Sequence, residues 1–313
     1  MTKVSIIIPC FNANRWIHDA LRSALGQDCE KEIIFIDDGS TDDSAGIVER
    51  EFPSVRIVRT KNQGTSKTRN FGTSLSSGQF LQYLDADDML APGKLKIQSE
   101  ALQKTGADVA YGDWQKLTEV KHGSFISGEI IKRRLDNPEI DLFTDFWCPP
   151  AAYLFRRSIV EKTGGWNENL PVIQDARFAL DCALHDGKFI YCPGVMASYR
   201  AHSSNSVSTR NSIAFVRDCL KNASEIERWW QDHGGVNDTR ENALFKVYGY
   251  AARASFEKDK RTFGEALSAL ERLNPGYIPV APRHLRATSR LFGYKNAEKI
   301  ASWYRRTLKS KII

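Results

Sequence analysis

The sequence contains no uninterrupted apolar run long enough to cross a lipid bilayer, which takes about 20 residues in a helix, so we expect no membrane span. The first apolar run, Val4 to Ile8, is too brief for the core of a secretory signal peptide, so none is expected. There is also no internal repeat and no low-complexity linker. These absences argue against an integral membrane protein and against a repeat protein.

Cysteine is present but scattered. The six cysteines form no CxxC pair and no Cys/His spacing of the kind found in zinc sites, so neither a zinc site nor a disulfide framework is indicated. A reducing compartment is the simpler interpretation, and we therefore expect a cytoplasmic protein. The cysteines are Cys10, Cys29, Cys148, Cys182, Cys192 and Cys219.

The positive charge is concentrated near the C-terminus. Residues 283–313 hold nine lysines and arginines and one acid, Glu298, which gives this segment a charge of +8. The remaining 282 residues carry −2, so the net charge of +6 belongs to the tail and not to the body. This distribution argues against a body that binds nucleic acid.

The first 115 residues alternate between β-branched runs and segments with helical spacing of apolar residues. Such alternation predicts an α/β fold with a mostly parallel sheet and helices on both faces. The expected strands are residues 4–8, 32–36, 55–58, 80–84 and 108–111, and the expected helices are residues 14–25, 40–48, 65–75 and 95–102.

The rest of the chain is less regular and then becomes helical. With 313 residues and 42% apolar content, the chain can form one large domain or two unequal ones with a real core. We expect a first domain at residues 1–205, made of halves 1–115 and 116–205, followed by a helical region at 206–313. The expected later elements are strands 151–155, 189–192 and 197–200, and helices 175–185, 212–230, 240–256 and 263–273.

Polar clusters fall where the predicted strands end. Asn12, Asp37-Asp38, Asn62 and Asp85–Asp88 each follow one of the first four strands. Ligands of open α/β sheets bind beyond the carboxyl ends of the strands. The shared placement therefore predicts that these clusters form one site.

The acids at 85, 87 and 88 follow the apolar strand that begins at Phe80. Asp85 and Asp87 are two residues apart, so on an extended backbone their side chains point the same way and repel each other unless a cation joins them. Oxygen ligands on a loop suit Mg²⁺ or Mn²⁺, with diphosphate oxygens completing the shell. The alternative is an acidic turn that caps the next helix, with Asp88 as N-cap.

Four stretches resemble, in order, the motifs of glycosyltransferase family 2, whose members have the GT-A fold. They are Val4–Asn12, Ile36–Asp42, Asn62–Gly72 and the DxD-like Asp85–Asp88. The resemblance covers residues 3 to 205 and leaves 206–313 uncovered. It implies a Rossmann-like sheet with flanking helices and a metal-dependent, inverting sugar transfer from a nucleotide-sugar donor.

The resemblance also implies the donor site. Asp37 or Asp38 would accept a hydrogen bond from the imide of uracil or thymine, while Phe11 and Asn12 would line the base and ribose pocket. Arg69 would steady the diphosphate or the first DxD acid, near a helix N-terminus that favours anions. The alternatives are acids that only start a helix, an ordinary turn and a surface arginine. The implied donor residues are Pro9, Phe11, Asn12, Asp37, Asp38, Asn62, Gly64, Arg69, Asp85 and Ala86.

The metal ligands are implied in the same way. Asp87 would bind Mg²⁺ or Mn²⁺ directly, and Asp85 would contact the ribose and a metal-bound water. The segment Tyr199–His202 resembles a motif whose histidine approaches the metal or the diphosphate, which makes His202 a third candidate. A loop histidine that is merely solvated is the alternative.

The catalytic base is implied by a Glu-Asp pair of the family, which opens a helix. Here the aspartate is Asp175, and Gln174 stands where the family has the glutamate. Asp175 would take the proton of the acceptor hydroxyl, unless it is only a helix N-cap. Glu168 is the reserve base, and the acceptor side would hold Glu168, Gln174 and Trp166. Trp166 is either an acceptor platform or a core tryptophan.

A non-processive enzyme that adds one sugar is favoured. The processive members carry Gln-x-x-Arg-Trp and several membrane spans, whereas this chain has Glu225 at the glutamine position of its Arg228-Trp229 and no spans. We expect a UDP-sugar donor and a saccharide or lipid-linked acceptor, as in cell-surface polysaccharide synthesis. The rival classes are a catalytically silent nucleotide-sugar-binding protein and a sugar nucleotidyltransferase. The latter needs a glycine- and base-rich first loop, which Cys10–Asn14 does not provide.

The basic tail has an amphipathic pattern. Ile300, Tyr304, Leu308 and Ile312 recur every four residues, with Trp303 beside them and bases on the flanks. Such a helix can lie on an anionic membrane surface, which would make the protein peripheral on the inner membrane face. The alternative is a helix that docks on the protein's own body.

Overall fold

The structure, a computed structural model, describes residues 2–121, 124–201, 212–280 and 282–309. The chain divides into two compact units, 1–206 and 207–313, which are described separately. Among the described residues, no helix combines the length and the apolar content that a bilayer span requires.

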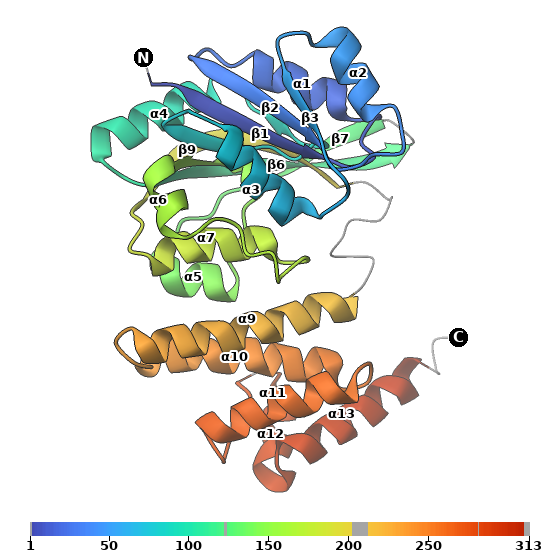
Figure 1. The fold of residues 1–313 in the computed structure, drawn as a ribbon. Coiled ribbons are helices and arrows are strands. Elements are labelled where there is room, and N and C mark those ends of the chain that lie inside the picture. Colours follow the sequence, from blue (N-terminus) through green and yellow to red (C-terminus); the bar gives the residue numbers. More distant parts are fainter. Residues whose placement is uncertain (1, 122–123, 202–211, 281, 310–313) are drawn as a thin grey trace. The chain divides into compact units, whose positions relative to one another are not determined.

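The first unit is built on a nine-stranded mixed sheet (Figure 1). Its strands follow the order β3-β2-β1-β4-β8-β6-β9-β5, and β7 pairs with β6. Neighbours among β1–β4 run parallel, whereas β8 is antiparallel to both β4 and β6. The strands are β1 Val4–Cys10, β2 Lys31–Asp37, β3 Arg56–Arg59, β4 Phe80–Tyr83, β5 Met89–Leu90, β6 Val109–Lys121, β7 Ser124–Ile131, β8 Tyr153–Arg156 and β9 Phe189–Ala201.

Helices cover both faces of this sheet, with α1 and α2 on one side and α3, α6 and α7 on the other (Figure 1). All seven residues of β1 are buried, as expected for a strand between two helical layers. The helices of this unit are α1 Ile17–Leu25, α2 Ser44–Glu51, α3 Thr65–Leu75, α4 Lys94–Thr105, α5 Pro138–Thr144, α6 Arg157–Lys162 and α7 Gln174–Leu184, with a 3₁₀ turn, η1, at Pro150–Ala152.

Helix α3 lies very close to the sheet because Gly72 has no side chain. A Cβ atom at Gly72 would come within 2.5 Å of Ile7 Cγ2 and 2.6 Å of Ile36 Cδ1. Contacts that short would force the helix away from β1 and β2. The absence of a side chain at Gly72 therefore lets α3 pack directly on β1 and β2.

A lysine is buried where α4 meets the sheet. Lys94 is fully buried, and its Nζ donates to Gln82 Oε1 on β4 and, at 2.6 Å, to the backbone oxygen of Tyr153 on β8. Burial lowers the pKa of Lys94 well below its usual value. The amine thus joins α4, β4 and β8 inside the core.

The structure corrects several predicted boundaries. The second helix begins at Ser44 and not at Ser40, because residues 40–42 form a loop whose backbone N–H groups bond to Asn12 and Asp37. The strand predicted at 108–111 continues to Lys121 and pairs with a strand that we did not predict, β7. The two strands predicted at 189–192 and 197–200 are one strand, β9, with register irregularities opposite Gly112 to Trp114.

The second unit is helical. Its core includes a buried carboxylate, Glu227, which binds Arg272 in two hydrogen bonds and accepts one from Tyr248 at 2.6 Å. Asn237 and Asp259 cap the second and third helices with their side chains. The described helices are α9 Ser212–Asp232, α10 Asp238–Ser255, α11 Lys260–Leu273, α12 Arg283–Phe292 and α13 Tyr294–Lys309.

Candidate active site

The acids at the end of β2 have different partners. Asp38 accepts hydrogen bonds at both carboxylate oxygens, from Thr60 and Gln63 on Oδ1 and from the Gly64 backbone on Oδ2 at 2.9 Å. Asp37 accepts from the backbone of Ser40 at Oδ1. Asp38 therefore holds the loop that leads into α3, and Asp37 is the acid with more acceptor capacity left for a ligand.

Asn12 joins the first two loops of the sheet edge. It adopts a left-handed backbone conformation (φ 54°), and its Oδ1 accepts from Thr41 N at 2.8 Å and Asp42 N at 3.3 Å. Beside it, the Phe11 ring is half exposed, whereas Pro9 is buried within β1. Phe11 is thus available to contact a ligand, while Asn12 shapes the loop.

The loop before α3 is also fixed by backbone geometry. Gly39 has a φ of 78°, and a Cβ there would lie 2.8 Å from the backbone nitrogen of Asn62. Gly64, with a φ of 91°, precedes the first turn of α3, and its carbonyl accepts from Thr68. Asn62 and Gly64 are both exposed, so the loop faces solvent, whereas Ser66 in the first turn of α3 is buried.

Arg69 connects this half of the site to the acids. The guanidinium is almost fully buried, donates to Asp85 through Nη2 and donates to Gln174 Oε1 through Nη1 at 3.1 Å. It lies 4.1 Å above the centre of the Trp166 ring, a cation–π distance. Arg69 is therefore a buried cation paired with the first acid, and not the surface arginine of the alternative interpretation.

Trp166 is a core residue. Its ring stacks on Phe178 at 4.1 Å and meets the edge of Tyr83 at 4.8 Å, and only 3% of its surface is exposed. This burial supports the core interpretation and argues against an acceptor platform. Glu168 lies at the surface, where it accepts from Asn70 at 3.2 Å.

Three acids gather after β4. Burial raises the pKa of Asp85; Arg69 lowers it, and Asp87 and Asp175 raise it further. Burial, followed by the charges of Asp87 and Asp85, raises the pKa of Asp88 well above its usual value. Asp88 Oδ1 accepts from Arg200 N at 2.9 Å, while its buried Oδ2 has no hydrogen-bond partner in the described part of the chain. Ala86 between them is buried.

The predicted base lies beside these acids. Asp175 is in the first turn of α7, where Ile173 and not Asp175 holds the N-cap position. Burial raises the pKa of Tyr199, and the charges of Asp88, Asp87, Asp85 and Asp175 raise it further. Three carboxylates of the turn after β4 and one of α7 therefore lie close enough to act on the same tyrosine.

Trp147 is a site residue that the sequence analysis missed. Its indole Nε1 donates to Asp175 Oδ2 at 2.7 Å. Trp147 lies 28 residues before Asp175, in a segment where the sequence predicted neither a helix nor a strand. No periodic pattern marks it, although a tryptophan before two prolines is a signal that could have drawn attention.

The metal ligands are described only in part. The described residues include no cluster of three or more His, Cys, Asp or Glu side chains arranged to hold a metal ion. The predicted third ligand, His202, lies outside those residues. Asp85 and Asp87 are thus the candidate metal ligands among the described residues, and Asp88 follows them in the chain.

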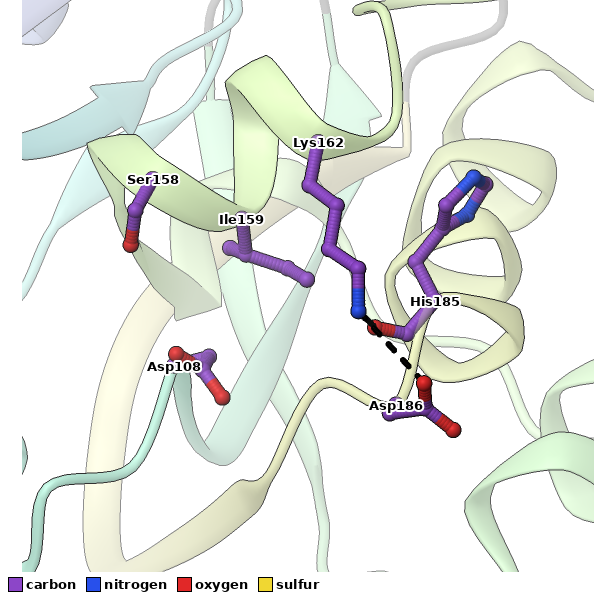
Figure 2. A pocket seen from close by; sticks show the side chains of 6 residues that line it. All are labelled: Asp108, Ser158, Ile159, Lys162, His185 and Asp186. Atoms are coloured by element: carbon purple, nitrogen blue, oxygen red, sulfur yellow. Dashed lines mark hydrogen bonds and ion pairs between the residues drawn. The ribbon is translucent and has the colours of Figure 1, made fainter.

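A pocket opens at the other end of the sheet. Asp108, which lines it, directly precedes β6, whereas the acids follow the carboxyl end of β4, and both strands run antiparallel to β8. In Figure 2, Lys162 reaches toward Asp186, with 3.4 Å between Nζ and Oδ2. This pocket is separate from the acids and is not a donor site. Its lining residues are Asp108, Ser158, Ile159, Lys162, His185 and Asp186.

Comparison with known proteins identifies the family. The model of glycosyl transferase family 2 matches residues 5–164, about half of the chain. An uncharacterized glycosyltransferase of Nostoc sp. is 27% identical over 82% of this chain and 80% of its own length. The glycosyltransferase GlyG of Streptococcus pneumoniae is 27% identical over 70% of this chain and 77% of its own.

Other similar proteins are much longer. An uncharacterized glycosyltransferase of Rickettsia felis is 33% identical over 41% of this chain, and the match spans only 23% of that protein. The chain thus spans about a quarter or less of the Rickettsia proteins that it matches.

Solved structures share the fold at low identity. Residues 1–349 of S. aureus TarS superpose with a TM-score of 0.69 at 18% identity, covering 98% of this chain and 92% of that one. The same TarS segment in complex with UDP-GlcNAc gives 0.68. The mannosyltransferase PcManGT of Pyrobaculum calidifontis, in complex with GDP-Man and Mn²⁺, gives 0.58 at 17% identity, over 96% of this chain and 83% of that one. The chain therefore belongs to glycosyl transferase family 2 and has the GT-A fold.

Proposed function

We propose that this chain is a metal-dependent, inverting glycosyltransferase that moves one sugar from a nucleotide-diphosphate donor, a UDP-sugar in the first instance, to an acceptor hydroxyl. The observation that carries the proposal is that Arg69 donates both to Asp85 and to Gln174, the neighbour of Asp175, so the proposed base and the acids after β4 meet at one guanidinium. Transfer chemistry needs a base on the acceptor side and a stabilised leaving group on the donor side. Residues for both tasks lie in this region.

The nucleotide-sugar donor would bind at the loops that follow β1, β2 and β3. Asp37 accepts the imide N–H of a uracil ring, and the exposed Phe11 ring lies against the base or ribose. The first turn of α3, which begins at Thr65, would face the diphosphate with its backbone N–H groups. The UDP-GlcNAc bound by TarS supports a uridine donor, while the GDP-Man bound by PcManGT is the competing possibility.

The acids after β4 fit a hard divalent cation. Asp85 and Asp87 supply carboxylate oxygens, which are the ligands that such a cation prefers. Asp87, with Asp85, would hold Mg²⁺ or Mn²⁺, and the donor diphosphate would complete the shell. Such an ion stabilises the negative charge of the departing nucleoside diphosphate.

Asp175 acts on the acceptor. Its carboxylate takes the proton of the attacking hydroxyl while that oxygen bonds to the anomeric carbon, and the sugar–phosphate bond breaks on the opposite face. Direct displacement inverts the anomeric centre. Gln174, next in the chain, accepts from Ser66 and Arg69 and so joins α7 to α3. A neutral side chain at position 174 is sufficient to accept these two hydrogen bonds.

The second unit suggests where the acceptor is found. Glu298, the acid of the α12–α13 segment, is fully buried, so the exposed charges described there are bases such as Lys295 and Lys299. Large apolar side chains lie exposed beside them, including Leu291 at 76% and Trp303 at 67%. This combination fits an anionic membrane surface, and hence a lipid-linked or other saccharide acceptor in cell-surface polysaccharide synthesis at the inner membrane face.

The membrane proposal is tested with vesicles. The full chain should sediment with vesicles rich in phosphatidylglycerol and remain in solution with phosphatidylcholine vesicles. Leu291→Ser combined with Trp303→Ser should abolish sedimentation while leaving the fold intact by circular dichroism. Equal sedimentation of wild type and variant would refute a membrane role for this surface.

The transfer proposal is tested with labelled nucleotide sugars. Wild type with Mn²⁺ should release nucleoside diphosphate from at least one UDP-sugar in the presence of a saccharide mixture, and EDTA should abolish this release. Asp175→Asn should reduce transfer by about 100-fold or more, the usual contribution of a general base, and should still bind UDP. Absence of product from every donor, with UDP binding retained, would instead indicate a silent binding protein.

A further inference from the structure

We propose that Trp147 is a positioning residue, which holds the carboxylate of Asp175 in the orientation needed to accept the acceptor's proton. This inference rests on the proposed role of Asp175 as base. The two side chains are joined by a hydrogen bond of 2.7 Å from indole Nε1 to Oδ2. Among the described residues, the indole is the side chain that donates to this carboxylate.

The indole is itself held in place by two aromatic neighbours. Its ring meets the edge of Trp114 on β6 at 5.2 Å and 89°, and the edge of Tyr199 on β9 at 5.2 Å and 79°. Trp114 and Tyr199 meet each other at 5.7 Å and 82°. Edge-to-face contacts of this kind fix ring orientation as well as adding stability. The rigid sheet therefore sets the direction of the Trp147 N–H bond.

The chain after Trp147 restricts it further. Pro149 and Pro150 have fixed φ angles, and the second of them opens η1 before β8. Cys148, between Trp147 and Pro149, is buried. A short, stiff segment therefore joins Trp147 to the sheet, and movement of the indole away from Asp175 would require movement of this segment.

The chemistry of the pair suits a base. An indole N–H donates and cannot accept, so it leaves the remaining lone pairs of the carboxylate for the acceptor hydroxyl. Oδ1 accepts from the backbone N–H of Ala176 at 2.8 Å. With one hydrogen-bond donor on each oxygen, the plane of the carboxylate is defined. A base held in a defined orientation accepts the proton of the hydroxyl more effectively.

The surrounding titratable groups make this donor important. The charge of Asp175 acts on Asp85, Tyr199, Tyr153 and Cys148. None of these four is a cation that would offset the charge of a carboxylate. The indole N–H donates to Oδ2 of this carboxylate, so its loss removes the side-chain contact that fixes the orientation of the base.

The first experiment tests the bond without any substrate. The full chain contains seven tryptophans, so ¹⁵N-labelled tryptophan gives seven indole N–H resonances, and Trp147→Phe assigns one of them by its loss. Asp175→Asn should then shift the Trp147 resonance more than any of the other six, which report an intact fold. A Trp147 resonance unmoved by Asp175→Asn would overturn the proposal.

The second experiment tests the effect of this hydrogen bond on the rate of sugar transfer. Trp147→Phe keeps an aromatic ring and removes the N–H group that donates the hydrogen bond. We expect kcat to fall about 10-fold or more, the factor for one hydrogen bond to a charged group, with the KM for the nucleotide sugar unchanged. The acid limb of the pH–rate profile should move to higher pH. Trp229→Phe, the same exchange in the second unit, is the matched control and should change neither.

The two experiments separate the two possible failures. If no donor is turned over by the wild type, the proposed function is wrong, while the resonance test still decides whether the bond exists. If transfer occurs and Trp147→Phe leaves kcat and the pH profile of the wild type unchanged, Trp147 packs against the base without positioning it.

Discussion

Replacement of Arg69 by methionine removes a buried guanidinium and leaves Asp85 without its counter-charge. Arg69 has 2% of its side chain exposed and Asp85 has 30%. Removal of one partner of a buried pair costs about 3–5 kcal/mol, and the exposure of Asp85 favours the lower end. The lost cation–π contact with Trp166 adds to the cost, and the new contact of methionine with the same ring offsets part of it. We expect a net loss of about 3 kcal/mol in the free energy of unfolding.

A double-mutant cycle isolates the pair. Asp85→Asn alone leaves the Arg69 cation buried beside a neutral amide, and Arg69→Met alone leaves the Asp85 carboxylate unpaired. The variant with both changes should be less destabilised than the sum of the two by about 1–3 kcal/mol, because residues in direct contact are not additive. The double variant should lose less stability than the sum because each single variant leaves a charge without its partner, and the double variant leaves neither.

The assay must report on the first unit by itself. Hydrogen exchange of β4 peptides, measured by mass spectrometry against urea concentration, gives the stability of the sheet that holds Asp85. The control is Arg59→Met, which breaks an ion pair with Glu49 whose two side chains are both more than half exposed, and which should change stability little. Equal losses for the two methionine variants, or strict additivity in the cycle, would refute the reasoning.

Two further predictions concern stability away from the acids. Burial alone would raise the pKa of Glu32, but hydrogen bonds from Ser5, Ser77 and Lys3 lower it to about 2. This depressed pKa contributes stability that is complete above about pH 4.5 and is lost as the pH falls toward 2. Glu32→Gln should therefore cost on the order of 2 kcal/mol at pH 7 and almost nothing at pH 2, measured by urea unfolding at each pH; a pH-independent cost would contradict this. Gly39→Ala should lower the thermal midpoint by an amount equivalent to about 1–3 kcal/mol, because its φ is positive and its Cβ would meet Asn62; an unchanged midpoint in calorimetry would show that the loop relaxes.

The parallel half of the fold could be predicted from the sequence. The strand at Val4 and the strand at Phe80 are continuous apolar runs that end in polar clusters, and the local pattern alone places those clusters at one edge of the sheet. The pattern predicts Asp85 as part of this site, whereas Asp175 is predicted only by the resemblance to the family.

The antiparallel half could not be predicted in the same way. The pairing of β6 with β7 depends on contacts between strands and on exposed residues such as Ile126 and Ile130, which carry little periodic signal. The sequence alone could not decide whether Trp166 is buried, because a tryptophan in a loop shows the same local pattern in the core and at the surface. The hydrogen bond of Trp147 joins segments that only the folded sheet brings together.

Lys94 has a consequence for how the site is held together. It lies six residues after Asp88, and its partner Tyr153 lies six residues after Trp147. The turn that carries the acids and the segment that carries the indole therefore share one solvent-free anchor. Loss of the Lys94 amine would therefore disturb both segments at once, although neither contains it.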